Sequence, residues 1–70
     1  MEPKRWWWNK NWGTSNRRDV KIFVGQDGWM VEARQGGAEG RSKTWQALTE
    51  ERAYQVADQL MVDGEWKSML

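Results

Sequence analysis

The sequence predicts an α+β domain in which a three-stranded antiparallel sheet packs on one C-terminal α-helix, in the order β-β-β-α. Two observations lead to this prediction. Apolar side chains alternate on both sides of an Asp-Gly pair at residues 27–28, a strong indication of a β-hairpin. Nearer the C-terminus, apolar residues recur at the spacing of an amphipathic helix. The predicted domain spans residues 19–70, and residues 1–18 are expected to form an irregular arm.

The first two strands are predicted over residues 19–24 and 28–34, where apolar and polar side chains alternate. If Asp27 and Gly28 form a two-residue loop, Val24 pairs with Val31 and Lys21 pairs with Arg34. One face of the hairpin then carries Val20, Ile22, Val24, Trp29, Val31 and Ala33. The other face carries Lys21, Phe23, Met30, Glu32 and Arg34.

This expected register places two like charges opposite each other. The pair of Lys21 and Arg34 costs a few tenths of a kcal/mol, roughly, unless an anion lies between them. Glu32, which is diagonal to Lys21, can balance the charge instead. The polar face is therefore either an anion-binding surface or an ordinary solvated one.

The third strand is predicted over residues 41–46, after a glycine-containing loop, and its phase is ambiguous. If Trp45 points inward without a bulge, Arg41 and Lys43 turn toward the edge of the core. In the opposite phase both cations lie on the outer face. We favour a bulge near Thr44, which buries the indole and leaves both cations outside, because burying an unpaired lysine costs several kcal/mol.

The helix is predicted over residues 50–63. Thr49 is a suitable N-cap, and two glutamates in the first turn complement the helix dipole. Gly64 is expected to end the helix. The small side chains of Ala53 and Ala57 would let the helix lie close to the sheet.

The arm interleaves cations with indoles, as in the segment Lys-Arg-Trp-Trp-Trp-Asn-Lys at residues 4–10. Indole rings stack on bases or bind cations, while Lys and Arg neutralise phosphates. Trp and Lys together also suit a bilayer interface, although no helical period accompanies this cluster. Alternatively, the indoles fold back and cover the small core.

The composition excludes several kinds of site. The chain has no cysteine and no histidine, so it lacks disulfides, thiolate metal sites and an imidazole base. Its longest apolar runs, such as the three tryptophans at residues 6–8, have three residues and are too short to cross a bilayer. A sandwich of this size offers a face instead of a catalytic cleft. We therefore expect a soluble, cytoplasmic, non-enzymatic protein without a cofactor or metal.

Charge is unevenly distributed along the chain. Residues 1–48 carry nine basic and five acidic side chains, a net charge of +4, and residues 49–70 carry two and five, a net charge of −3. Such polarity suits a protein that turns one side toward a polyanion. A mixed-charge solvated surface is the alternative interpretation.

The strand Gly-Trp-Met-Val-Glu-Ala-Arg at residues 28–34, the glycine loop, Arg41 and the alanine-containing helix resemble the plant ethylene-response-factor DNA-binding domain. In that family the strand reads Gly-x-Trp-Ala-Ala-Glu-Ile-Arg. The element order is also similar to the arm-binding N-terminal domains of phage and transposon integrases. These families lay a three-stranded sheet in the major groove. By position, the resemblance implies that Glu32, Arg34, Arg41 and Lys43 face the groove.

Two functions follow as hypotheses. The first is a nucleic-acid-binding module of a phage or bacterial regulator, in which contacts come from Lys21, Glu32, Arg34, Arg41 and Lys43 on the sheet and from Arg5, Lys10, Arg17 and Arg18 in the arm. The expected stacking or partner anchors are Trp6, Trp7, Trp8, Trp12, Phe23 and Met30. The second is a protein-interaction domain that binds a larger protein machine through the arm or the exposed sheet face. The oligomeric state is left open, since an exposed sheet edge can pair with a second copy.

Overall fold

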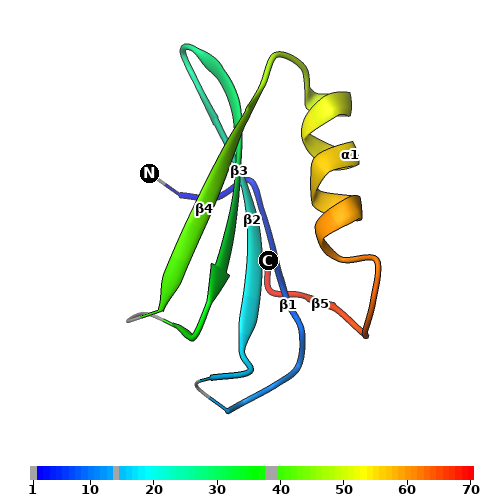
Figure 1. Ribbon diagram of the computed structural model, residues 1–70. Coiled ribbons are helices and arrows are strands. Elements are labelled where there is room, and N and C mark those ends of the chain that lie inside the picture. The colour runs from blue at the N-terminus through cyan, green and yellow to red at the C-terminus, as the bar shows by residue number, and fades with distance from the viewer. Residues whose placement is uncertain (1, 14, 38–39) are drawn as a thin grey trace.

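A computed structural model describes residues 2–13, 15–37 and 40–70, which fold into two layers, a five-stranded antiparallel sheet and one α-helix (Figure 1). The elements are β1 (Arg5–Trp8), β2 (Arg18–Gly25), β3 (Gly28–Gln35), β4 (Arg41–Ala47), α1 (Glu50–Leu60) and β5 (Lys67–Ser68). The strands lie in the order β4-β3-β2-β1-β5. The α+β class, with an antiparallel sheet and one helix, is confirmed, but the sheet has five strands where three were predicted.

The expectation of an irregular arm is wrong for its first half, because β1 is part of the sheet. Trp6 pairs with Lys21, and Trp7 pairs with Val20. Alternation along β1 turns Trp7 toward the helix, where it packs against the core, and turns Trp6 and Trp8 to the other face. Three consecutive tryptophans conceal this period of two in the sequence. Pairing within the sheet therefore shelters indoles that would be costly to expose as a mobile arm.

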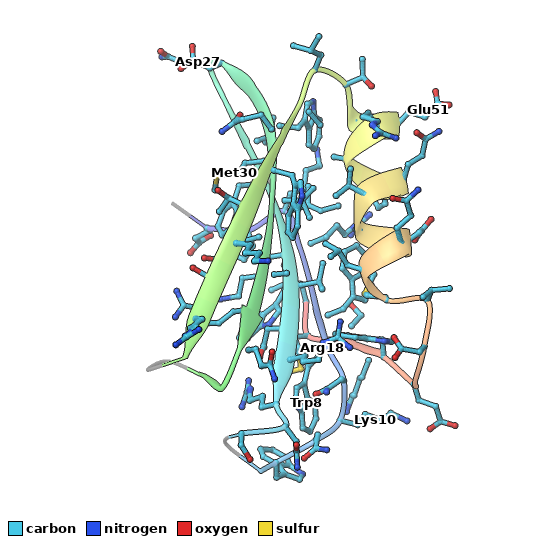
Figure 2. The ribbon with its side chains drawn as sticks, viewed as in Figure 1. Trp8, Lys10, Arg18, Asp27, Met30 and Glu51 are labelled. Atoms are coloured by element: carbon cyan, nitrogen blue, oxygen red, sulfur yellow. The ribbon has the colours of Figure 1, made fainter. Side chains whose placement is uncertain are left out.

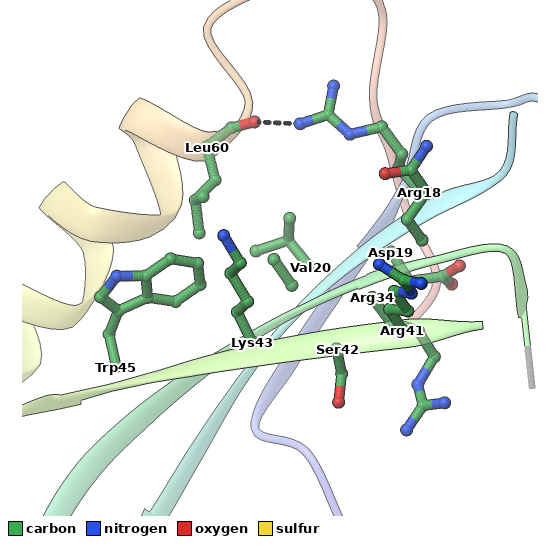
Figure 3. A pocket seen from close by; sticks show the side chains of 11 residues that line it. Arg18, Asp19, Val20, Arg34, Arg41, Ser42, Lys43, Trp45 and Leu60 are labelled. Atoms are coloured by element: carbon green, nitrogen blue, oxygen red, sulfur yellow. Dashed lines mark hydrogen bonds between the residues drawn. The ribbon is translucent and has the colours of Figure 1, made fainter.

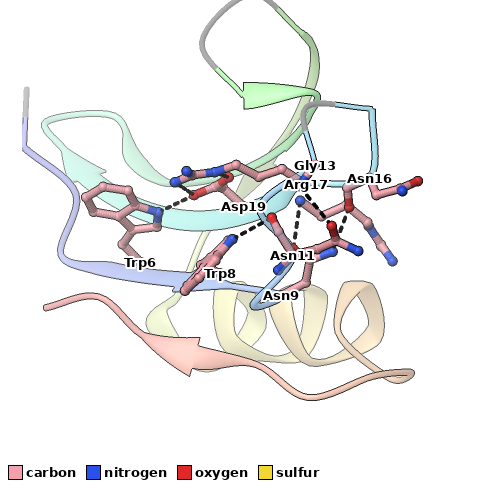
Figure 4. Close-up of polar contacts among 9 residues, drawn as sticks. Trp6, Trp8, Asn9, Asn11, Gly13, Asn16, Arg17 and Asp19 are labelled. Carbon is pink, nitrogen blue, oxygen red and sulfur yellow. Dashed lines mark hydrogen bonds and ion pairs between the residues drawn. The ribbon is translucent and has the colours of Figure 1, made fainter.

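Asparagine side chains hold the connection between β1 and β2 (Figure 4). Asn9 Oδ1 accepts hydrogen bonds from the backbone N–H groups of Asn11, at 3.3 Å, and Arg18, at 3.0 Å. Its Nδ2 donates to the Asn16 carbonyl oxygen at 2.9 Å. The described residues 9–13 and 15–17 of the arm therefore form a connecting loop fixed to the end of the sheet.

The β2–β3 turn is formed by Gln26 and Asp27, one residue earlier than predicted. A two-residue type I′ turn needs positive φ at both central residues, whereas here Asp27 keeps a negative φ and Gly28 alone has a positive one, +114°. Every pairing consequently shifts by two residues. Lys21 faces Glu32, Phe23 faces Met30 and Asp19 faces Arg34. The expected like-charge pair of Lys21 and Arg34 is not formed, although both side chains remain on the predicted face.

The favoured bulge in the third predicted strand is also wrong. Val31 pairs with Trp45 and Ala33 pairs with Lys43 in an uninterrupted β3–β4 ladder. Trp45 therefore lies on the helix side of the sheet, and alternation places Arg41 and Lys43 on that same side. Both cations remain exposed because α1 does not extend over this end of β4. Without burial there is no desolvation cost that would require a bulge.

The core lies between the sheet and α1. Val20, Ile22, Val31 and Ala47 meet Ala53 and Ala57, as predicted from the small helix residues. Thr49 is confirmed as the N-cap, because its Oγ1 accepts from the Arg52 N–H at 3.1 Å.

The helix ends at Leu60, before the predicted residues 61–63, and Met61 is its C-cap in place of Gly64. The Arg18 guanidinium donates to the Leu60 carbonyl oxygen at 3.0 Å. It supplies a partner and a positive charge at the helix C-terminus, where both are favourable.

Candidate functional site

The side of the sheet opposite α1 carries no helix in the described chain (Figures 1 and 2). Met30, labelled in Figure 2, points away from the helix on this side. We define the open face by the side chains of β1, β2 and β3 that register and alternation place there together with Met30, which are Trp6, Trp8, Asp19, Lys21, Phe23, Glu32 and Arg34. Arg17 lies at its rim.

A buried carboxylate organises one end of the open face (Figure 4). Asp19 is only 4% exposed. Its Oδ2 accepts a hydrogen bond from Trp6 Nε1 at 2.7 Å, and the Arg17 guanidinium donates to both carboxylate oxygens, at 2.9 and 3.2 Å. The same guanidinium lies 5.6 Å from the ring centroid of Trp8. Asp19 thus fixes the Trp6 indole and the Arg17 guanidinium, and the latter lies against the ring of the buried Trp8.

The surroundings of Asp19 keep it ionised at neutral pH. Burial by itself raises the pKa of the Asp19 carboxyl, but hydrogen bonds from Arg17 and Trp6, with the charges of Arg17 and Lys21, outweigh that effect. The net pKa lies below the ordinary value. The hydrogen bond to Asp19 in turn raises the pKa of Arg17. The pair is therefore fully charged and held in one geometry.

Besides the Asp19–Arg17 pair, a second row of charged side chains lies across the middle of the open face. The Lys21 ammonium lies 4.6 Å from the ring centroid of Trp6, a cation–π geometry. Lys21 also faces Glu32 across the β2–β3 ladder, and the Glu32 carboxylate lies 3.6 Å from the Arg34 guanidinium. Two cations are thus positioned around one acid and one indole.

The acidic side chains of the open face are less exposed to solvent than its arginines. The side chains of Asp19 and Glu32 are 5% and 16% exposed, whereas those of Arg17 and Arg34 are 27% and 30% exposed. Lys67 of β5 adds an exposed cation on this side, since it pairs with Trp8. A partner approaching the open face therefore meets guanidinium and ammonium groups first. The acidic side chains of α1, such as Glu51 in Figure 2, lie on the far side of the molecule.

The end of the open face near the β2–β3 turn is apolar. Phe23 and Met30 pair directly across the hairpin, and both are half-buried. Val24, on the other face of the same hairpin, is exposed. This end of the hairpin can offer apolar contact beside the cations.

The predicted cationic platform is divided between the two sides of the sheet. Lys21 and Arg34 lie on the open face, but Arg41 and Lys43 lie on the helix side because β4 pairs without a bulge. Arg5, Trp7 and Arg18 are on the helix side too. There the Arg5 Nε donates to the Tyr54 hydroxyl at 2.7 Å, and Trp7 makes an edge-on contact with the Tyr54 ring.

The remaining predicted residues lie on the loop between β1 and β2. The Lys10 ammonium is 3.6 Å from the Glu65 carboxylate. Trp12 is 78% exposed, and its ring centroid lies 4.5 Å from that of Trp8. Neither residue joins the rows of charges described above.

Sequence reasoning missed Asp19 and Lys67. Asp19 shares the alternation of Lys21 and Phe23, so its face was readable from the sequence. Its burial was not, because the covering indole belongs to the unexpected strand β1. Lys67 lies in a strand of two residues, too short for any periodic pattern.

Comparisons with known proteins supply no further assignment. Neither family models, nor curated proteins, nor solved structures give a significant match to this chain. Within residues 2–13, 15–37 and 40–70, no group of acidic side chains could hold a metal ion. In the same residues, no helix has the length and apolar character needed to cross a membrane.

Proposed function

We propose that the open face binds duplex DNA as a small non-enzymatic module. One observation supports this proposal above the others: the arginines of this face are more exposed than its acids, while the acidic helix lies behind the sheet. Bonds to Asp19 and Glu32 hold Arg17 and Arg34 in place, so little side-chain freedom is lost when a phosphate binds.

The dimensions favour the β2–β3 ribbon as the part that enters the groove. Five strands about 4.8 Å apart are wider than the DNA major groove of about 12 Å, which accepts a two-stranded ribbon. β2 and β3 are the central and neighbouring strands of the sheet. Lys21, Glu32 and Arg34 would then face base edges or phosphates. Arg17 and Lys67 at the flanks would contact the phosphate backbone.

Fluorescence anisotropy with a labelled duplex, measured over a series of salt concentrations, tests this proposal. Because each phosphate contact contributes about −0.9, we expect a log-log salt slope between about −2 and −4. Lys21→Gln and Arg34→Gln should each weaken binding and bring the slope about one unit closer to zero. Circular dichroism checks that both variants remain folded.

Matched charge removals elsewhere provide the controls. Lys43→Gln removes one charge on the helix side of the sheet, and Arg52→Gln removes one on α1. Both should leave the salt slope unchanged. Equal losses of DNA affinity in all four variants would rule out the open face as a DNA site. The absence of DNA binding at low salt would do the same.

The paired side chains Phe23 and Met30 favour a second candidate, docking of a protein on the same face. Aromatic, Met and Arg side chains are enriched in the cores of protein interfaces. Such binding would survive moderate salt, persist after nuclease treatment and be lost in Phe23→Ala. A salt-resistant partner with no DNA affinity would replace the first proposal by this one.

A further inference from the structure

The sheet has two very unequal edges. One edge is β5, with two residues, and the other is β4, with seven. In the described chain β4 pairs with β3, and no other backbone hydrogen bond involves residues 41–47. The outer N–H and C=O groups of β4 are therefore available to another extended segment.

Two exposed cations lie along this edge, and no described acidic side chain pairs with either of them. Arg41 and Lys43 are two residues apart, so both project from the helix side of the sheet. Among the described residues, neither forms an ion pair or a side-chain hydrogen bond. By contrast, Arg18 on the same side donates to Leu60 and lies 3.7 Å from the Asp63 carboxylate. Arg41 and Lys43 are thus the cations on this side left for a partner.

A hollow with a mixed polar and apolar lining adjoins these cations (Figure 3). Because α1 ends at Leu60, the sheet beyond it is uncovered, and a hollow of about 430 Å³ opens between the helix end and the strands. Val20, Ala33, Trp45 and Leu60 supply its apolar lining, and the Lys43 side chain rises beside them. An apolar side chain carried past β4 would find contact there.

We infer that β4 accepts an extended acidic peptide by strand addition. Two carboxylates at alternate positions of the peptide lie opposite Arg41 and Lys43, and an apolar side chain two positions further lies opposite Trp45. In the antiparallel orientation the peptide reads apolar-x-acid-x-acid. Directly opposed side chains in such a pair are about 5 Å apart, close enough for ion pairing.

Charge complementarity selects this occupant over a second copy of the chain. Pairing two β4 edges along their full antiparallel length would place Arg41 opposite Ala47 and Lys43 opposite Trp45 of the other copy, so neither cation would gain a carboxylate. An acidic strand neutralises them instead. The backbone supplies affinity along the whole edge, and the two cations supply the preference for carboxylates.

Titration of the isotope-labelled protein with the capped peptide Thr-Leu-Thr-Glu-Thr-Glu-Thr tests the inference, with Thr-Leu-Thr-Lys-Thr-Lys-Thr as the control. We expect saturable shifts of amide resonances 41–47 and slower hydrogen exchange along β4 with the acidic peptide. The lysine peptide should bind at least tenfold more weakly. Lys43→Gln should weaken acidic-peptide binding about threefold, as expected for one exposed ion pair.

Lys21→Gln is the matched variant, because its charge lies on the open face. It should leave peptide binding unchanged while weakening DNA binding, so the two proposals can fail independently. Equal binding of both peptides, or shifts confined to the open face, would overturn the inference. A dimer in sedimentation, with β4 amides already protected before the peptide is added, would assign the edge to a second copy and also overturn it.

Discussion

Trp6 Nε1 donates a 2.7 Å hydrogen bond to Oδ2 of Asp19, a residue that is not its pairing partner in the sheet. Trp6 pairs with Lys21, so this bond runs diagonally between β1 and β2 and adds a side-chain link to the backbone ladder. The same carboxylate anchors Arg17. One buried acid therefore joins the N-terminal strand, the following loop and the centre of the sheet.

Replacing Asp19 by Asn should destabilise the fold. The substitution removes the charge that holds the Arg17 guanidinium and leaves a cation beside a neutral amide in a poorly solvated site. We expect the free energy of unfolding to fall by about 2 kcal/mol, measured by urea denaturation. Glu32→Gln is the control, because the Glu32 side chain is 16% exposed against 5% for Asp19, and it should cost less than about 1 kcal/mol. Equal losses in the two variants would contradict a special role for Asp19.

The stabilisation from Asp19 should disappear in acid. Its pKa is lowered by folding, so the ionised form favours the native state. This contribution is fully present above the ordinary carboxyl pKa of about 3.9 and is lost as the pH falls through the lower folded value. Urea denaturation at several pH values should show that the difference in the free energy of unfolding between the wild type and Asp19→Asn shrinks in that window. A constant difference down to the lowest pH would show that the folded pKa is not depressed.

Gly40 should not tolerate alanine. A Cβ at this position would overlap the backbone carbonyl of Gln35, which cannot move without breaking the β3–β4 ladder. We expect Gly40→Ala to lower the free energy of unfolding by about 2 kcal/mol or more, measured by thermal denaturation. In Gly13→Ala the new Cβ would lie 3.4 Å from the Asn11 side-chain oxygen, an ordinary contact, and stability should change little. Similar losses in both variants would point to a general effect of removing glycine.

The close approach of α1 to the sheet depends on small side chains. Ala57 is fully buried between the two layers. Ala57→Leu should force the helix away from the strands and cost about 2 kcal/mol in urea denaturation. The same new side chain at exposed Gln59 should change stability by less than about 0.5 kcal/mol. An unchanged midpoint in Ala57→Leu would mean that the layers are not closely packed at this point.

The face on which each hairpin side chain lies could be predicted, because alternation depends only on the extended backbone. Pairing partners could not, because they depend on the φ angle of one turn residue, Asp27. A slip of the turn by one position moves each partner by two, which preserves the face of every side chain. This is why Lys21, Phe23, Met30, Glu32 and Arg34 share the predicted face although each has a different partner.

The sequence analysis missed β1 and β5 for a different reason. β1 consists mostly of tryptophans, which give no polar contrast, and β5 is too short to show one. Both strands form by pairing with the edge of a strand that is distant in the sequence, and local sequence patterns give no information on such pairing. The position of Arg41 and Lys43 was missed because lysine burial was assumed wherever Trp45 points inward. The early end of α1 removes that cost.

Trp7 pairs with Ser68 and Trp8 with Lys67, so the outermost rung joins the first strand of the chain to its last. Closing a loop of nearly the whole chain is entropically expensive, and the two residues of β5 return few contacts for it. This rung should therefore assemble last during folding and open first by fraying. Its opening would uncover the outer edge of β1 while β1 stays paired with β2, so β5 can detach and expose a second strand edge without unfolding the hairpin or the helix.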